Sequence, residues 1–172
     1  MTSLPPVTLV LGGARSGKSR YAESLVDRHP GRRTYLATAE ILDDEMAERV
    51  KAHRQRRDSD WKTVEEPLEL AAILKAETEQ GAAVLVDCLT LWLGNLMGKE
   101  RDVEAEIAGL VAALIQFGGP VVFVSNEVGL GIVPDNAMAR RFRDLAGTLH
   151  QRLAEQADRV VFVAAGLPLT LK

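Results

Sequence analysis

Short apolar runs alternate along this chain with longer stretches whose apolar residues recur at helical spacing. The runs are rich in Val, Leu and Phe and alternate little with polar residues, which is typical of parallel strands buried on both faces. They predict strands over residues 7–11, 34–37, 83–86, 121–125 and 159–164. The stretches between them predict helices over residues 18–28, 43–57, 68–79, 103–117 and 135–157. Residues 166–172 predict a last short strand.

This alternation predicts an α/β fold with a mostly parallel central sheet, helices on its faces and right-handed crossovers. The uncharged stretch 107–126 is long enough to raise the question of a membrane span. However, Gly118, Gly119 and Pro120 divide it, so a buried helix and a buried strand are the better interpretation. Ligands bind at the carboxyl ends of the strands in such a sheet, so the segments that follow strands are the places to search.

The segment after the first predicted strand matches the phosphate-binding loop G-x-x-x-x-G-K-[ST], with a strand before it and a helix after it. Backbone N–H groups of such a loop wrap a phosphate chain. We expect Lys18 to reach the β- and γ-phosphates as a candidate catalytic residue, and the Ser19 hydroxyl to bind Mg²⁺. The fingerprint G-x-G-x-x-G is absent, so a nucleoside triphosphate is favoured over NAD. The candidate nucleotide-binding residues of the loop are Gly12, Gly13, Ala14, Arg15, Ser16, Gly17, Lys18 and Ser19.

A second candidate metal ligand, Asp87, ends the predicted strand 83–86. Magnesium prefers carboxylate oxygens, and an acid at a strand tip beside a phosphate loop holds the ion directly or through water. The alternative is an ordinary turn or helix-capping aspartate. We expect the neighbouring Cys88 to be a small buried residue rather than a reactive thiol. The sequence thus predicts one P-loop catalytic domain over residues 1–172.

The helix predicted over residues 43–57 begins with acidic residues and ends with Arg54, Arg56 and Arg57, a polarity that complements the helix dipole. Its last turns also place a cationic patch beside His53. Spacing leaves two interpretations open. His53 is either packed at a helix end beside solvated charges, or it is a nucleophile or proton carrier whose arginines grip phosphate oxygens.

Other segments also allow a structural or a functional interpretation. Trp61 either stacks on a base or, more simply, packs in the core. Glu65 either accepts hydrogen bonds from a base edge or ribose, or is a surface carboxylate. The loop at 124–135 either shapes a second substrate pocket or is an ordinary turn, and His150 is expected at the surface.

Composition narrows the class of protein further. The net charge of −3 does not suggest a binder of nucleic acid or of anionic membranes. One cysteine excludes an internal disulfide, and the first residues lack a signal-peptide pattern, so we expect a cytoplasmic location. The absence of an Asn-Lys-x-Asp motif argues against a signalling GTPase.

Three motifs together resemble one family, the bifunctional adenosylcobinamide kinase / adenosylcobinamide-phosphate guanylyltransferases of cobalamin biosynthesis. They are G-G-A-R-S-G-K-S at 12–19, I-L-D-D-E-M at 41–46 followed by His53 and Arg54, and N-E-V-G-L-G-I-V-P at 126–134. The resemblance covers residues 7–172. It implies a RecA-like core and a homo-oligomer, often a trimer.

The resemblance also implies two reactions and their residues. ATP or GTP first phosphorylates the aminopropanol hydroxyl of adenosylcobinamide. GTP then transfers GMP to a histidine, which matches His53, and adenosylcobinamide-phosphate takes the GMP to give adenosylcobinamide-GDP. Other residues carried over to the nucleotide site are Ala37, Thr38, Ala39, Arg54, Gln55, Arg56, Arg57, Glu65 and Asp87.

Two competing hypotheses stay open beside this one. The first is a kinase that acts on another small alcohol and uses His53 only structurally. The second is a nucleotide-responsive module that binds GTP without turnover.

Overall fold

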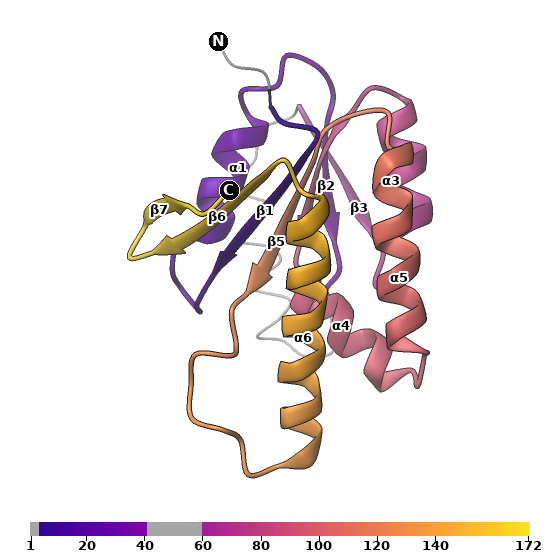
Figure 1. Cartoon of the computed structure of the whole chain (residues 1–172). Coiled ribbons are helices and arrows are strands. Elements are labelled where there is room, and N and C mark those ends of the chain that lie inside the picture. The colour runs from indigo at the N-terminus through magenta and orange to yellow at the C-terminus, as the bar shows by residue number, and fades with distance from the viewer. Residues whose placement is uncertain (1–3, 41–59) are drawn as a thin grey trace.

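A computed structural model describes residues 4–40 and 60–172, which form a seven-stranded sheet (Figure 1). The strand order is β3-β2-β4-β5-β1-β6-β7. All neighbouring pairs are parallel except β6 and β7, which form an antiparallel hairpin. The bounds are β1 Val7–Gly12, β2 Arg33–Ala37, β3 Trp61–Glu65, β4 Ala83–Asp87, β5 Val121–Asn126, β6 Arg159–Ala164 and β7 Leu167–Thr170.

Five α-helices and one short 3₁₀ helix are found in the described part of the chain. They are α1 Lys18–Val26, α3 Leu70–Glu79, α4 Leu89–Gly98, α5 Val103–Ala113, the 3₁₀ helix η1 Leu114–Gln116, and α6 Ala137–Gln156. The helix predicted over 43–57 lies outside the described residues. Within the part that is described, no helix is both long and apolar enough to cross a membrane.

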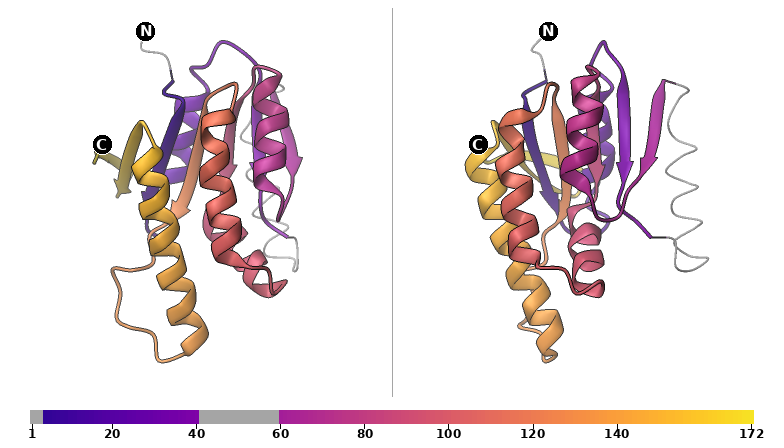
Figure 2. Two further views of the ribbon diagram at one scale, coloured as in Figure 1. Left: turned by 45° about the vertical axis from the view of Figure 1, so that its right-hand side comes forward. Right: turned by 90° about the vertical axis from the view of Figure 1, so that its right-hand side faces the viewer.

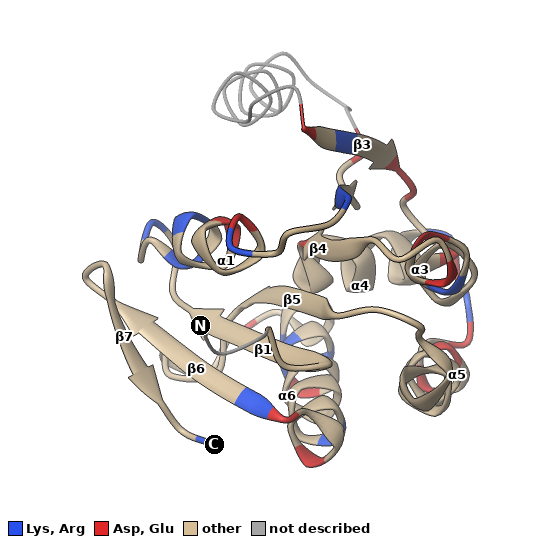
Figure 3. Ribbon diagram, turned by 90° about the horizontal axis from the view of Figure 1, so that it is seen from above, with Lys and Arg blue, Asp and Glu red and all other residues tan. Residues whose placement is uncertain are grey.

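The sheet separates two apolar cores. Helix α1 packs on one face, where Ala22, Leu25 and Val26 contact buried residues of the central strands. Helices α3 to α6 pack on the other face around a larger core that includes Trp92 and Phe123. Figure 3 shows α1 on one side of the sheet and α5 and α6 on the other, and Figure 2 shows α5 and α6 side by side. Every central strand is therefore covered on both faces, as its continuous apolar sequence predicts.

Local chemistry sets the helix boundaries. The Asn136 side chain accepts hydrogen bonds from the N–H groups of Met138 (2.8 Å) and Ala139 (3.1 Å), so α6 begins two residues later than the predicted start at 135. The helix predicted over 103–117 ends as η1 before Gly118 and Gly119. A Cβ on Gly119 would lie 2.6 Å from the Ala82 carbonyl oxygen, so this close approach of two backbones requires glycine.

The structure confirms the five predicted buried strands, the final short strand and the α/β class. It adds two elements that the sequence analysis did not predict, the edge strand β3 and the short helix α4. Helix α4 follows directly on β4, so it changes the surroundings of the Asp87 tip.

Candidate functional site

The phosphate loop Gly12–Ser19 joins β1 to α1 at the carboxyl edge of the sheet. Two of its residues have positive φ, Arg15 (53°) and Gly17 (94°), and this tight path turns the backbone into the start of α1. A Cβ on Gly12 would lie 2.5 Å from the Val163 carbonyl oxygen and 2.6 Å from Ser16 Oγ. The first loop glycine is therefore required by crowding.

Neighbouring elements hold this loop from two sides. The Gly166 N–H, in the β6–β7 turn, donates to the Ser16 carbonyl oxygen (2.7 Å), and the Glu127 N–H, after β5, donates to the Gly12 carbonyl oxygen (3.0 Å). Within the loop, Lys18 Nζ donates to the Gly13 carbonyl oxygen (3.1 Å). The loop backbone is thus fixed by contacts of the protein itself, and the Lys18 ammonium lies over it.

Asp87 ends β4 and points to the same face of the sheet as α1. Side chains alternate along a strand, and Ala83 and Leu85 belong to the α1-side core, so Asp87 continues that row. The Tyr35 hydroxyl donates to Asp87 Oδ2 (3.3 Å), which fixes the carboxylate from the neighbouring strand β2.

The donor set offered here fits Mg²⁺. The Asp87 carboxylate at the tip of β4 and the Ser19 hydroxyl at the end of the loop are hard oxygen ligands. Among residues 4–40 and 60–172, no group of three or more His, Cys, Asp or Glu side chains is placed to hold a metal ion. Magnesium needs no such cage, because it is usually bound through one or two carboxylates together with phosphates and water.

Thr38 joins the tips of β2 and β4. Its side chain is fully buried, and its hydroxyl accepts from the Cys88 N–H (2.9 Å) and donates to the Cys88 carbonyl oxygen (2.8 Å). Its own carbonyl oxygen accepts from Asn95 Nδ2 (2.7 Å). The hydroxyl is therefore engaged by Cys88. A direct contact between Thr38 and a nucleotide stays a prediction.

Cys88 is buried, as the sequence predicts. Burial raises the pKa of its thiol, and the negative charge of Asp87 raises it further, while the Thr90 hydroxyl and the charge of Lys18 oppose this shift. The thiol therefore stays protonated near neutral pH, as expected for a structural cysteine.

The remaining described candidates lie on β2 and β3. Glu65 ends β3 and is paired in register with Ala37, and Ala39 lies just beyond, half-buried. Trp61 packs against the α1-side core and donates from Nε1 to Asp27 Oδ1 (3.1 Å), which supports the packing interpretation of this residue. The nucleotide contacts predicted for Glu65, Ala37 and Ala39 stay predictions.

Five predicted site residues lie outside the described part of the chain. The structure therefore does not test their expected roles in guanylyl transfer or phosphate binding. They are His53, Arg54, Gln55, Arg56 and Arg57.

The prediction that His150 is a surface residue is wrong. Its Nε2 lies 2.7 Å from Ser125 Oγ on β5, and burial lowers its pKa, with the charge of Glu127 opposing the shift. The signal that was available is its spacing on α6. His150 follows the buried Ala146 by four residues, so it lies on the buried side of the helix.

The loop after β5 is shaped by its own hydrogen bonds. Glu127 accepts from the N–H groups of Gly129 (2.7 Å) and Leu130 (3.1 Å), and Arg140 donates to the Pro134 carbonyl oxygen (2.8 Å). These contacts support the structural interpretation. A role in shaping a substrate pocket stays a prediction.

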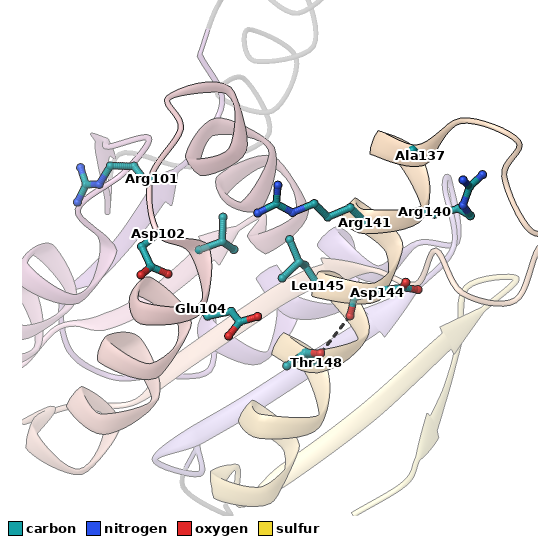
Figure 4. A pocket seen from close by; sticks show the side chains of 10 residues that line it. Arg101, Asp102, Glu104, Ala137, Arg140, Arg141, Asp144, Leu145 and Thr148 are labelled. Carbon is teal, nitrogen blue, oxygen red and sulfur yellow. Dashed lines mark hydrogen bonds between the residues drawn. The ribbon is translucent and has the colours of Figure 1, made fainter.

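A surface cavity of about 630 Å³ lies between the start of α5 and the first half of α6 (Figure 4). Arg101, on its rim, is held by ion pairs with Glu69 and Glu106. None of the predicted site residues within the described part of the chain lines this cavity. The lining residues are Arg101, Asp102, Val103, Glu104, Ala137, Arg140, Arg141, Asp144, Leu145 and Thr148.

Solved structures confirm the predicted fold class. An ATPase from the type III secretion system of pathogenic bacteria superposes with a TM-score of 0.59 at 12% identity, over 97% of this chain and 57% of that one. The flagellar accessory protein FlaH from Methanocaldococcus jannaschii gives a TM-score of 0.55 at 10% identity, over 98% and 80%. A further solved ATPase domain gives 0.52 at 13% identity, over 92% and 69%. At such identities the likeness shows a RecA-like P-loop fold and no more.

Comparison with sequence relatives identifies the family, which the solved structures do not. The chain is 49% identical to the bifunctional adenosylcobalamin biosynthesis protein CobP of Pseudomonas aeruginosa, over 95% of this chain and 96% of the relative. It is 42% identical to the proteins named CobU of Salmonella typhimurium and Escherichia coli, over 95% of this chain and 98% of each. The family model described as cobinamide kinase / cobinamide phosphate guanyltransferase matches residues 8–171. With the phosphate loop and Asp87 assembled at one edge of the sheet, these matches show that the chain belongs to the cobinamide kinase / cobinamide phosphate guanyltransferase family.

Proposed function

We propose that this bifunctional enzyme uses the phosphate loop for phosphoryl transfer to adenosylcobinamide, and His53 for transfer of GMP to the resulting phosphate. The observation that carries the proposal is a phosphate loop whose backbone is already fixed, with Lys18 over it and Asp87 at the tip of β4 on the face where α1 packs. This arrangement suits the triphosphate of ATP or GTP.

In the kinase reaction, the aminopropanol oxygen forms a bond to the γ-phosphorus as the bond to the β,γ-bridging oxygen breaks. A nucleoside diphosphate leaves, and the hydroxyl proton passes to solvent. Lys18 stabilises the charge that develops on the β- and γ-phosphate oxygens, and the loop N–H groups orient the phosphate chain. Fixed donors need no reorganisation when this charge develops, so they lower the barrier.

Ser19 and Asp87 are the residues that would hold Mg²⁺ in this site, and the bound ion would neutralise phosphate charge. Tyr35 keeps the Asp87 carboxylate in place by its hydrogen bond. The negative charge of Asp87 and its position at the tip of β4 would both favour binding of the ion.

In the guanylyl transfer, a neutral His53 nitrogen forms a bond to the α-phosphorus of GTP and pyrophosphate leaves. The phosphate of adenosylcobinamide-phosphate then displaces the histidine and forms adenosylcobinamide-GDP. Arg54, Arg56 and Arg57 neutralise the departing pyrophosphate, and Gln55 adds a hydrogen bond. Ala37, Thr38, Ala39 and Glu65 complete the nucleotide site near the tips of β2 and β3.

Covalent labelling tests this assignment. The protein is incubated with GTP radiolabelled in the α-phosphate, beside the variant His53→Ala and the control His29→Ala, which removes a histidine remote from the motif. An acid-labile, base-stable label on the wild type and on the control, absent from His53→Ala, is the expected result. Label that persists in His53→Ala would remove this residue from the guanylyl transfer.

The same samples separate the competing hypotheses. Phosphoryl transfer to a small alcohol other than cobinamide, without covalent label, would favour the kinase that uses His53 only structurally. Tight GTP binding without either reaction would favour a nucleotide-responsive module.

We further propose that the chain is a single catalytic domain located in the cytoplasm. We also propose that it forms a homo-oligomer, which the family resemblance suggests is a trimer. Large apolar side chains are exposed on the loop after β5 and the adjoining turn of α6, including Leu130 (83%), Ile132 (98%) and Met138 (72%). Such a patch suits burial between subunits. Light scattering coupled to size-exclusion chromatography tests the oligomeric state, and a monomeric mass at micromolar concentration would contradict it.

A further inference from the structure

Asn126 lies at the tip of β5, between the strand that carries the phosphate loop and the strand that carries Asp87. The register pairs Asn126 with Gly12 on β1, and Val124 with Asp87 on β4. Neighbouring strands lie about 4.8 Å apart, so the Asn126 backbone adjoins the start of the phosphate loop. It also extends two residues further along the sheet edge than Asp87.

The Asn126 side chain faces the α1 side of the sheet. Val122 and Val124 belong to the α1-side core, and side chains alternate along a strand, so Asn126 continues their row. Ser125 points to the opposite face, where it contacts His150 of α6. Asn126 and Asp87 thus lie on the face of the sheet on which α1 packs, at the edge where the phosphate loop begins.

A buried hydroxyl fixes the orientation of the Asn126 amide. Its Nδ2 donates to Thr90 Oγ1 (2.9 Å), and Thr90 Oγ1 is in turn 3.1 Å from Cys88 Sγ. Thr90 and Cys88 are both buried, whereas Asn126 is only half-buried. In the described part of the chain, no group donates a hydrogen bond to Asn126 Oδ1, so this oxygen remains open as an acceptor.

We propose that Asn126 Oδ1 accepts a hydrogen bond from the hydroxyl group that attacks the γ-phosphorus, and so orients the acceptor alcohol in the kinase reaction. The proposal rests on the kinase activity proposed above. An amide oxygen is too weak a base to remove the proton, so the bond changes are those already described and the proton still passes to solvent. Asn126 directs an oxygen lone pair of the alcohol toward phosphorus, and orientation of this kind accounts for a large part of enzymatic rate enhancement.

The proposal predicts a loss confined to one of the two reactions. The variant Asn126→Ala should lower kcat for phosphorylation of cobinamide about 100-fold, the loss that misplacement of a reacting group by about 1 Å causes. Its KM for the nucleotide, and the covalent labelling by GTP radiolabelled in the α-phosphate, should stay within about twofold of wild type. The labelling also reports that the variant is folded.

Thr90 provides the matched test of positioning. Thr90→Val removes the hydroxyl that holds the amide and should lower the kinase kcat about tenfold, whereas Thr90→Ser keeps the hydroxyl and should restore it. Kinase turnover of Asn126→Ala close to that of wild type would overturn the proposal, and so would an equal fall in both reactions. A wild type that accepts the GMP label but phosphorylates no cobinamide would instead refute the kinase assignment, and this proposal with it.

Discussion

The same substitution should have opposite effects on stability at two fully buried threonines. Thr38 and Thr8 are both wholly inaccessible to solvent. The Thr38 hydroxyl makes two hydrogen bonds with Cys88, whereas the Thr8 hydroxyl has no partner in the described part of the chain. Valine replaces the hydroxyl of either residue by a methyl group of similar size.

The magnitudes follow from the partners left behind. In Thr38→Val, the Cys88 N–H loses its partner, which costs about 1–3 kcal/mol for a buried donor, and the bond to the Cys88 carbonyl adds about 1 kcal/mol. That carbonyl keeps its bond from the Trp92 N–H (3.2 Å). We therefore expect a destabilisation of roughly 2–4 kcal/mol. Thr8→Val removes an unsatisfied buried hydroxyl and should stabilise the fold by about 1 kcal/mol.

Urea denaturation followed by tryptophan fluorescence measures both changes, provided that the variants keep the wild-type dependence on urea. The exposed Thr63→Val on β3 is the control for a change of β-propensity alone and should stay within about 0.5 kcal/mol of wild type. A Thr38→Val protein as stable as wild type would refute the reasoning, and so would a Thr8→Val protein that loses more than about 1 kcal/mol.

Two further predictions concern the phosphate loop and the half-buried His150. Gly12→Ala would place a methyl group 2.5 Å from the Val163 carbonyl oxygen, so GTP binding by calorimetry and the melting temperature should both fall sharply. Gly13→Ala, whose Cβ would meet nothing within 4 Å, should leave the melting temperature nearly unchanged; equal losses in both variants would contradict the crowding argument. Because burial lowers the pKa of His150, the unfolded state binds its proton first, and the free energy of unfolding should decline as the pH falls below about 6.5. Urea denaturation across this pH range should show a smaller decline of the free energy of unfolding in His150→Gln than in wild type. An identical decline would refute the assignment of the pH dependence to His150.

The sequence predicts the strands that are covered on both faces of the sheet, because these are continuous apolar runs. The strands β1, β4 and β5 are continuous apolar runs, since both of their faces are covered. Strand β3 was missed because it is an edge strand with mostly exposed side chains, so its five residues show no apolar run. Helix α4 was missed because it is short, contains Gly94 and follows β4 without a separating turn, although Leu89, Trp92, Leu93 and Leu96 recur at helical spacing.

Some residues of the candidate site can be predicted from local sequence pattern, and others depend on the tertiary fold. The phosphate loop and Asp87 could be found because each follows a strand directly and has a characteristic residue type. Thr38, Thr90 and Asn126 depend on which strand tips are neighbours, and a strand order such as β4-β5-β1 cannot be read from local pattern. The pairing of Ser125 with His150 likewise depends on how α6 crosses the sheet.

The central position of β1 has a consequence for how the protein is made. Its partners, β5 and β6, come late in the chain, and the N–H of Val7 bonds to Asp158, 151 residues further on. During synthesis the phosphate loop therefore exists as sequence long before the backbone contacts from Glu127 and Gly166 can shape it. Contacts of such long range slow folding. A nascent chain that stops before β6 should expose an unpaired apolar strand and bind no nucleotide.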